Sequence, residues 1–338
     1  MKLTVNLQEK SYDIIIEHGV LSRVGEYANL NRKVLVISDD GVPKQYVDTL
    51  LSQCPQGYAH IVKQGEGAKS FPVYQELCQK LLDLNFSRTD CILALGGGVI
   101  GDLSGFVAST YLRGIEFIGI PTTTLSQIDS SIGGKVAINL DDVKNIIGNF
   151  YHPSAVLIDP DTLKTLPERH FVNGLVEALK AGLIYDASLL TLFETCDPKT
   201  TIDQIIYQSL QVKKAVVEQD EKEQNLRKIL NFGHTLGHGI ESVYGLKDLL
   251  HGECVAIGMI PMLEDDALKQ RVLQIYQKLG LQSDIAYDPD DVYAVMKKDK
   301  KVQGDFITVV KVKEAGHARL EKIPTPDLYQ YLKSINPI

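Results

Sequence analysis

The sequence predicts an α/β domain followed by a mainly α-helical domain. Three observations lead to this prediction. Short apolar runs alternate with helical patterns up to about residue 160. A glycine-rich segment directly follows one of these runs and opens a helix. Beyond about residue 160 the pattern is almost entirely helical. The length of 338 residues also fits two domains. We therefore expect one domain over residues 1–165, with a mostly parallel sheet, and a helical domain over residues 166–338.

The elements of the first half are expected in the following order. An opening strand pair lies at residues 3–7 and 12–17, buried strands lie at 33–37, 59–62, 91–95, 117–120 and 155–158, and helices lie at 43–50, 71–84 and 99–111. Apolar strands that alternate with helices indicate a mostly parallel sheet covered on both faces. Ligands of such sheets bind beyond the carboxyl ends of the strands, so the residues that follow each strand are candidate site residues.

The composition limits the class of protein. The chain is 44% hydrophobic and 23% charged, as is usual for globular proteins, and its net charge of −8 argues against nucleic-acid and membrane-surface partners. The five cysteines are scattered and form no C-x-x-C pair, which indicates reduced thiols in the cytoplasm. No signal-peptide core and no membrane-spanning run is present in the sequence.

Several strand ends carry residues suited to a nucleotide. Asp39 follows the strand at 33–37, where a carboxylate either binds a ribose diol or forms a turn. Residues 96–102 contain G-x-G-x-x-G between a strand and a helix, and such glycines let the backbone approach a pyrophosphate. This segment does not follow the first strand, so the cofactor need not lie as in common dehydrogenases. Thr122 and Thr123 follow the strand at 117–120 and could cap a helix, bind the cofactor, or both.

A polar, glycine-rich stretch suits an anion. Residues 126–135 end in Gly133-Gly134-Lys135, and Lys144-Asn145 follow shortly after. Backbone N–H groups and an ammonium can converge on a bound anion in such a loop. The alternative is a β-turn with a solvated lysine. Arg113 adds a further cation after the glycine-rich helix.

The second half carries a candidate metal site. Helices are expected at 162–166, 175–180, 200–218, 227–244, 251–263, 271–279, 289–298 and 326–334, with one short strand at 307–310. His234 and His238 are four residues apart and share a helix face, and His251 follows closely. Histidines with a carboxylate are typical of catalytic zinc. The alternative is a packed helix with core histidines, but three of the chain's eight histidines in positions 234–251 favour a metal site.

The pieces together indicate an oxidation chemistry. A metal ion beside a nicotinamide is typical of enzymes that oxidise an alcohol. Isolated cations are spread along the chain, and they indicate a substrate with two anionic groups: Arg113, Lys135, Lys144, Lys180, Lys213, Arg227 and Lys300. From the residues alone we expect a metal- and nicotinamide-dependent enzyme that acts on a small polyhydroxylated anion.

The sequence also resembles a known family over a large part of its length. The matching runs are GGGVIGDLSGFVASTYLRG, IPTTTLSQIDSSIGGKVAIN, KNIIGNFYHP, DEKEQNLRKILNFGHTLGHGIE, HGECVAIGM and DKK, between about Asp39 and Lys301. The chain resembles the 3-dehydroquinate synthase family of sugar-phosphate cyclases. The resemblance implies an N-terminal NAD-binding domain, a C-terminal helical metal-binding domain, a divalent metal ion (zinc, or cobalt or another), and a homodimer.

The resemblance also implies a reaction and a set of residues. The family converts the phosphorylated sugar acid 3-deoxy-D-arabino-heptulosonate 7-phosphate into 3-dehydroquinate and phosphate. It does so by transient oxidation with NAD, β-elimination of phosphate, reduction, ring opening and intramolecular aldol closure. No dedicated base is assigned, because the substrate phosphate itself can take the proton.

The metal ligands implied are Glu177, His234 and His251, so that His238 contacts the substrate phosphate instead. Implied cofactor contacts are Asp39, Glu66, Lys69, Gly97, Gly98, Val99, Asp102, Thr122, Thr123, Leu125, Asp129, Lys135, Lys144 and Thr165. Implied substrate or catalytic residues are Asp129, Lys135, Asn145, Lys180, Lys213, Glu223, Arg227, Asn231, His238 and Lys300, with Arg113 reaching the neighbouring subunit's site.

Departures from the family and alternative functions remain. His170 stands where the family usually has an acid, and Leu236 and Gly239 replace a commoner Phe and Ala. One alternative is a cyclase with another product, such as 2-deoxy-scyllo-inosose, but that substrate lacks the carboxylate that Arg227 and Lys213 suit. A second is a glycerol-type dehydrogenase, which needs fewer anion-binding residues. A third is an NAD-binding protein without catalysis, which the intact metal-site residues disfavour.

Overall fold

The computed structural model describes residues 1–7, 10–141, 143–283, 285, 287–297 and 306–335. The chain divides into two compact units, Met1–Pro167 and Glu168–Ile338, and each is described by itself. The first is built on a mostly parallel sheet and the second is mainly helical, so the predicted fold class is confirmed. Within the described ranges, no helix combines the length and apolar character needed to cross a membrane.

The N-terminal unit contains a seven-stranded sheet in the order β1-β2-β9-β6-β5-β3-β4. The strands are β1 (Lys2–Val5), β2 (Tyr12–Ile16), β3 (Lys33–Asp39), β4 (Gln56–Val62), β5 (Cys91–Gly96), β6 (Glu116–Pro121) and β9 (Ala155–Ile158). All neighbours pair in parallel except β1 with β2. The carboxyl ends of β3, β5 and β6 therefore point the same way, and candidate residues follow each of them.

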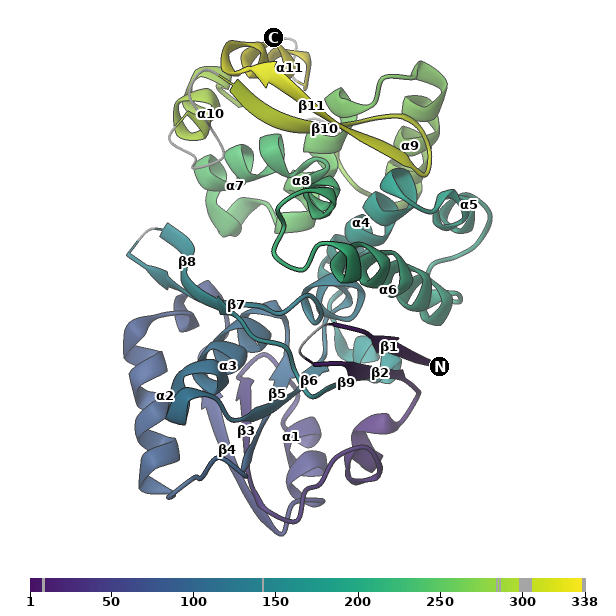
Figure 1. The fold of residues 1–338 in the computed structure, drawn as a ribbon. Helices are drawn as coiled ribbons and strands as arrows, with labels where there is room; N and C mark the ends of the chain where they lie inside the picture. Colours follow the sequence, from purple (N-terminus) through teal and green to yellow (C-terminus); the bar gives the residue numbers. More distant parts are fainter. Residues whose placement is uncertain (8–9, 142, 284, 286, 298–305, 336–338) are drawn as a thin grey trace. The chain divides into compact units, whose positions relative to one another are not determined.

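Helices cover both faces of this sheet (Figure 1). Because side chains alternate along a strand, Val34 and Val36 of β3 face the core shared with η1 (Val20–Glu26) and α1 (Lys44–Leu51). Leu35 and Ile37 face the core shared with α2 (Phe71–Asp83) and α3 (Gly98–Thr110). Burial on both faces explains why these strands read as continuous apolar runs.

A hairpin replaces the loop that the sequence predicted after residue 126. A π-helical turn, η4 (Ser126–Ser130), leads into β7 (Lys135–Leu140) and β8 (Val143–Phe150), which pair only with each other among the described strands. Val136 and Ile138 of β7 belong to the core beneath α3. A Cβ added at Gly105 of α3 would lie 2.4 Å from Val136 Cγ1, so the hairpin packs directly on that helix. Short turns η2 (Glu66–Ala68), η3 (Tyr111–Arg113) and η5 (Pro160–Thr165) complete the unit.

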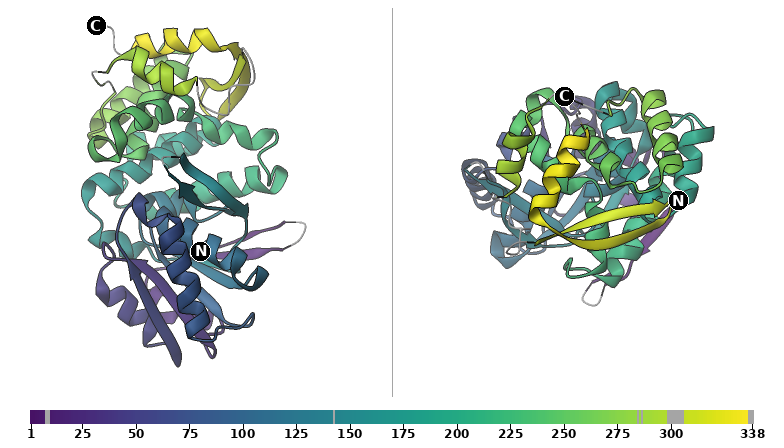
Figure 2. Two further views of the ribbon diagram at one scale, coloured as in Figure 1. Left: turned by 90° about the vertical axis from the view of Figure 1, so that its left-hand side faces the viewer. Right: turned by 90° about the horizontal axis from the view of Figure 1, so that it is seen from above.

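The C-terminal unit consists of helices with one hairpin near the end of the chain. The helices are α4 (Glu168–Ile184), α5 (Ala187–Thr195), α6 (Ile202–Gln219), α7 (His234–Asp248), α8 (His251–Met259), α9 (Asp266–Leu279), α10 (Pro289–Met296) and α11 (Leu328–Ile335). Short turns are η6 (Leu226–Asn231), η7 (Ile260–Met262) and η8 (Thr325–Asp327), and the strands are β10 (Phe306–Glu314) and β11 (His317–Pro324). Helix α11 lies beside this hairpin in Figures 1 and 2. Helix α5 and strand β11 were not predicted.

The single helix predicted over residues 227–244 is wrong. Residues 226–231 form the 3₁₀ turn η6, and Gly233, with φ +76°, separates it from α7. A Cβ at Gly233 would lie 2.7 Å from the carbonyl oxygen of Val255, and one at Gly258 would lie 2.2 Å from that of Gly233. Helices α7 and α8 therefore touch through their backbones, and only a glycine allows the chain to turn at position 233.

Candidate active site

The glycine-rich segment leaves bare backbone at the start of α3. Gly97 is the N-cap residue, and Gly98 and Val99 begin the helix. A Cβ at Gly98 would lie 3.0 Å from Ser130 Oγ, and the backbone N–H of Thr122 donates to the carbonyl of Gly96 at 3.0 Å. A cavity at this point is lined by Gly97, Gly98, Asp102, Ser130 and Lys135, among others. Free N–H groups at a helix N-terminus, with a lysine beside them, can hold a phosphate.

A buried polar network lies beside this helix. Lys69 is 3% exposed, and its ammonium contacts Asp102 at 2.8 Å and Glu66 at 3.3 Å. It also donates to the side-chain oxygen of Asn145 on β8. Burial alone would lower the pKa of Lys69, but the carboxylates of Asp102 and Glu66 hold it above its ordinary value. Asn139 of β7 links η2 to β8, because its side chain donates to Glu66 at 2.9 Å and accepts from the Asn145 N–H at 2.8 Å.

The other predicted residues of the N-terminal unit lie at strand ends and turns. Asp39 ends β3, accepts from the Gly41 N–H at 2.9 Å, and has a pKa raised by burial. Thr123, Leu125 and Asp129 lie in or before η4, Lys144 lies on β8, and Thr165 ends η5.

Arg113 is displayed by an unusual turn. Arg113 and its neighbour Leu112 both have left-handed backbone conformations, with φ of +67° and +51°. Such conformations are costly for residues other than glycine, and they cluster at functional sites.

The C-terminal unit holds a buried carboxylate among imidazoles. Glu177 of α4 is 3% exposed, and neither carboxylate oxygen has a hydrogen bond of regular geometry. Its Oε1 lies 3.6 Å from His234 Nε2 and 3.7 Å from His251 Nε2, while the Lys180 ammonium contacts Oε2. Burial would raise the pKa of Glu177, but Lys180 and His251 hold it below its ordinary value. An ionised carboxylate buried in this way needs a cationic partner.

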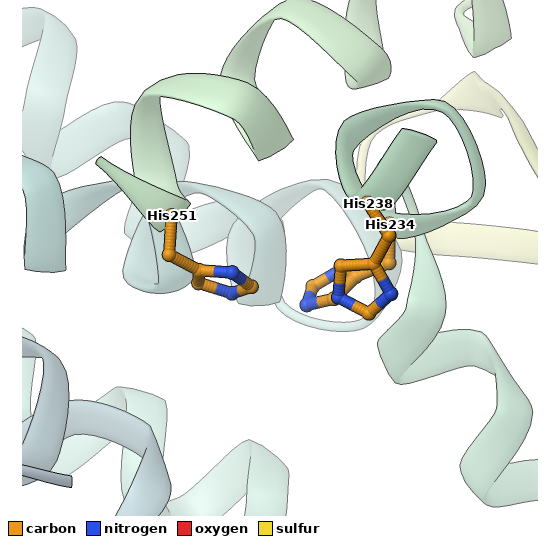
Figure 3. A group of neighbouring side chains, drawn as sticks. All are labelled: His234, His238 and His251. Atoms are coloured by element: carbon orange, nitrogen blue, oxygen red, sulfur yellow. The ribbon is translucent and has the colours of Figure 1, made fainter. Parts of the chain in front are cut away.

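The histidines have different electrostatic surroundings. Burial, with Lys180 and the two other imidazoles nearby, lowers the pKa of His234 well below its usual value, so its neutral form, which ligates metals, is favoured. The pKa of His251 is raised despite burial, because Glu177 and Glu241 are close. Figure 3 shows His251 from one helix pointing toward His234 and His238 from another.

These side chains fit a metal ion in two overlapping ways. The ring nitrogens of His234, His238 and His251 lie within 4.8 Å of one another, which suits a three-histidine site. Glu177 offers the alternative of one carboxylate and two histidines, since both Nε2 atoms face its Oε1. We favour the set with Glu177, because Lys180 contacts only its Oε2, while the buried Oε1 has no hydrogen-bond partner and faces both Nε2 atoms. A carboxylate and two imidazoles are a usual donor set for catalytic zinc.

Buried cations accompany this centre. Lysine and arginine are almost never fully buried without a partner. In the described part of this unit, the buried lysines and arginines are Lys180, Lys213 and Arg227, and the N-terminal unit has Lys69. All four were predicted as site residues. Lys213 lies on α6 and Arg227 on η6.

The turn that presents Arg227 is organised by an acid that the sequence analysis did not select. Asp220 accepts hydrogen bonds from the backbone N–H groups of Gln224, Asn225 and Arg227 at 2.7–3.0 Å. Within the turn, Glu223 has φ +58° and accepts from the Asn231 amide at 2.6 Å. The predicted residue Lys300 lies outside the described residues.

Comparison with known proteins gives the family. Two family models match, described as 3-dehydroquinate synthase N-terminal over residues 59–173 and C-terminal over residues 174–302. A 3-dehydroquinate synthase of Clostridium kluyveri is 41% identical over 350 residues, covering 98% of each chain. One of Streptococcus suis is 40% identical over 354 residues, covering 98% of this chain and 100% of its own. The chain belongs to the 3-dehydroquinate synthase family.

A solved structure supports the fold. The 2-epi-5-epi-valiolone synthase from Streptomyces hygroscopicus subsp. jinggangensis, solved with NAD+ and Zn2+ bound, is 27% identical, with a TM-score of 0.87 and 98% of each chain covered. The predicted membership of the 3-dehydroquinate synthase family and the predicted activity, a lyase that forms 3-dehydroquinate with loss of phosphate, are confirmed. A glycerol-type dehydrogenase or another cyclase has less support, because the 3-dehydroquinate synthases are 40–41% identical over 98% of the chain, whereas the valiolone synthase is 27% identical.

Proposed function

We propose that the chain converts 3-deoxy-D-arabino-heptulosonate 7-phosphate into 3-dehydroquinate and phosphate in the shikimate pathway, which leads to chorismate and the aromatic amino acids. The cofactors proposed are NAD and a divalent metal ion, zinc first and cobalt as an alternative. The observation that carries the proposal is the buried Glu177 carboxylate facing two imidazole Nε2 atoms at 3.6 and 3.7 Å. The NAD+ and Zn2+ bound to the valiolone synthase support both cofactors.

Glu177, His234 and His251 would hold the metal ion. When bound, the ion supplies Lewis-acid chemistry to a substrate hydroxyl, and NAD supplies reversible hydride transfer. Lys180 keeps Glu177 ionised, because its ammonium contacts the buried carboxylate. A neutral His234 is ready to act as a ligand without first losing a proton.

The cations divide between the two anionic groups of the substrate. Lys213 and Arg227 bind the carboxylate, and their burial strengthens this attraction by excluding water. The phosphate is bound by Lys135, Asn145, His238 and Lys300. Asn231 and Glu223 hold each other through their hydrogen bond and orient the substrate beside Arg227.

The N-terminal unit binds NAD. The start of α3 and Lys135 take the pyrophosphate, because backbone N–H groups and an ammonium meet in one cavity there. Asp39, Glu66 and Lys69 contribute polar contacts to the nucleoside parts. The remaining cofactor contacts proposed are Val99, Asp102, Thr122, Thr123, Leu125, Asp129, Lys144 and Thr165.

The functional form proposed is a cytoplasmic homodimer without nucleic-acid or membrane partners. No disulfide joins any two of the five cysteines, all of which lie in the described residues, and this fits a reducing compartment. The left-handed turn at Leu112 and Arg113 fits an arginine presented to a second subunit.

Phosphate release tests the reaction. The heptulosonate phosphate is supplied with catalytic NAD and zinc, and phosphate and NADH absorbance are followed together. Phosphate release without accumulation of NADH is expected, because the hydride returns to the product. Stoichiometric NADH would indicate a dehydrogenase, and the absence of both signals would refute the proposed substrate.

Subunit mixing tests the dimer. Arg113→Ala and His234→Ala are each expected to be inactive alone. If Arg113 acts in the partner's site, mixed dimers contain one site with both residues intact and regain activity. Light scattering that shows only monomers, or no recovery in a mixture shown to contain mixed dimers, would contradict this arrangement.

A further inference from the structure

His251 lies between two carboxylates, one at each ring nitrogen. Its Nε2 lies 3.7 Å from Glu177 Oε1, and its Nδ1 lies 3.0 Å from Glu241 Oε2. His234 has a related arrangement, with Nε2 3.6 Å from Glu177 Oε1 and Nδ1 3.1 Å from the carbonyl oxygen of Phe232. Both rings therefore turn the same nitrogen toward Glu177 and have an oxygen acceptor behind the other.

The acceptor behind each ring determines which nitrogen can bind a metal ion. The raised pKa of His251 favours a doubly protonated ring while no metal ion is bound, so metal binding must displace one of its two protons. The imidazole that binds a metal ion is neutral and carries one N–H group and one lone pair. An ionised carboxylate or a carbonyl can only accept, so Nδ1 must carry the proton for the hydrogen bond to form. The lone pair then lies on Nε2. Such a partner fixes both the tautomer and the orientation of a metal-ligating histidine.

We propose that Glu241 is a positioning residue, which accepts the hydrogen bond of His251 Nδ1 and thereby presents Nε2 of His251 to the metal ion. The inference rests on the proposed metal-dependent function of the same site. Nothing in the sequence analysis assigned a role to Glu241.

The packing of two helices makes this contact possible. Glu241 lies on α7, seven residues after His234 and three after His238, so it shares their face. His251 is the first residue of α8. A Cβ at Gly237 would lie 2.9 Å from the carbonyl of Cys254, so α7 and α8 approach closely enough for the Glu241 side chain to reach His251. The Glu241 side chain is only 11% exposed, which protects the hydrogen bond from competition by water.

His234 provides an internal control. Its Nδ1 faces a main-chain carbonyl, which no side-chain substitution removes. A change at Glu241 should therefore disturb the tautomer of His251 and leave that of His234 as it is. A general loss of structure would disturb both histidines.

The test measures metal affinity and tautomers in Glu241→Ala, Glu241→Gln and the wild-type protein. Affinity for Zn2+ is measured by competition with a chelator, and the imidazole nitrogens are observed by ¹H–¹⁵N NMR with labelled histidine. We expect Zn2+ affinity to fall about 10- to 100-fold in Glu241→Ala. Glu241→Gln should lose less, because its amide oxygen can still accept. In the Zn2+-bound proteins only the His251 signals should change, because only Nδ1 of His251 has lost its acceptor. Glu194→Ala, which removes a carboxylate that pairs with Arg271 at the surface, should retain wild-type affinity.

The outcomes separate this inference from the proposed function. A wild-type protein that does not bind Zn2+ would refute the metal site itself. A wild-type protein that binds Zn2+, with unchanged affinity and unchanged His251 signals in Glu241→Ala, would refute the role of Glu241 alone. If Glu241→Ala does not fold, Glu241→Met replaces it, because methionine has a similar length and lacks the carboxylate acceptor. Wild-type affinity and an unchanged His251 tautomer in that variant would also refute the role of Glu241.

Discussion

The candidate site of the N-terminal unit consists mainly of backbone groups, whereas that of the C-terminal unit consists of charged side chains. In the N-terminal unit, the site at the start of α3 is mostly backbone, exposed by glycines such as Gly97 and Gly98 where β5 ends. In the C-terminal unit, the site is a set of buried charged side chains around Glu177. The backbone groups of the first site are in place whenever the unit is folded. The second site also requires that each buried charge has a partner of opposite charge. Substitutions of the glycines of α3 should therefore act mainly on stability, and substitutions of the charged side chains around Glu177 mainly on ligand binding and turnover.

The largest effect is expected from His234→Ala. This substitution removes a ligand atom that faces Glu177, and we expect Zn2+ affinity to fall by more than about 100-fold, with turnover abolished. The fold should be retained, because the side chain lies at the start of α7 and not inside the apolar core. Metal content by mass spectrometry and circular dichroism measure the two properties. His317→Ala, on an exposed strand, is the matched control. Stoichiometric zinc in the His234→Ala protein would remove His234 from the ligand set.

Elements that leave a local pattern in the sequence were predicted, whereas elements that depend on contacts with distant residues were missed. Strands such as β3 and β5 were predicted because burial on both faces leaves a continuous apolar run in the sequence. The hairpin β7–β8 was not predicted. Its sequence is polar and contains glycine, and the hairpin is stabilised by contact of Val136 with α3. The break at Gly233 was missed because its cause is the backbone of α8.

The residues of the candidate sites also differ in whether a local sequence pattern identifies them. Histidine spacing identified the metal region, and the glycine segment identified the start of α3. The spacing alone favoured His234 and His238 as joint ligands, and Glu177 was named only by the family resemblance. In the structure, the burial of Glu177 favours it as a ligand over His238. Supporting residues such as Asn139 and Asp220 were not selected, because they act by hydrogen bonds to backbone groups whose positions the sequence does not give.

A smaller effect on binding is expected from Arg227→Ala. The buried guanidinium is proposed to bind the substrate carboxylate, and a charged hydrogen bond contributes about 1.5–3 kcal/mol. The KM for the heptulosonate phosphate should therefore rise roughly 10- to 100-fold, with a smaller change in kcat if ground state and transition state are bound equally. Arg271→Ala, which removes a half-exposed arginine paired with Glu194, controls for the loss of a cation. An unchanged KM in Arg227→Ala would show that the carboxylate is bound elsewhere.

The smallest effect is expected from two alanine substitutions on α3, and it tests how this helix packs against β7. A Cβ at Gly105 would meet Val136 at 2.4 Å, whereas one at Gly101 would have no heavy atom within 4 Å. Gly105→Ala should cost about 1–3 kcal/mol in the free energy of unfolding, because the hairpin must shift to make room. Gly101→Ala should be neutral or stabilising by up to about 1 kcal/mol, because alanine favours the helix. Urea unfolding of both variants measures the difference at an equal denaturant slope.

Equal midpoints would mean that β7 does not pack on α3 as described. A large loss in Gly101→Ala would instead show that the third glycine of the G-x-G-x-x-G pattern, and not Gly105, is the position at which α3 is held closely against its neighbours.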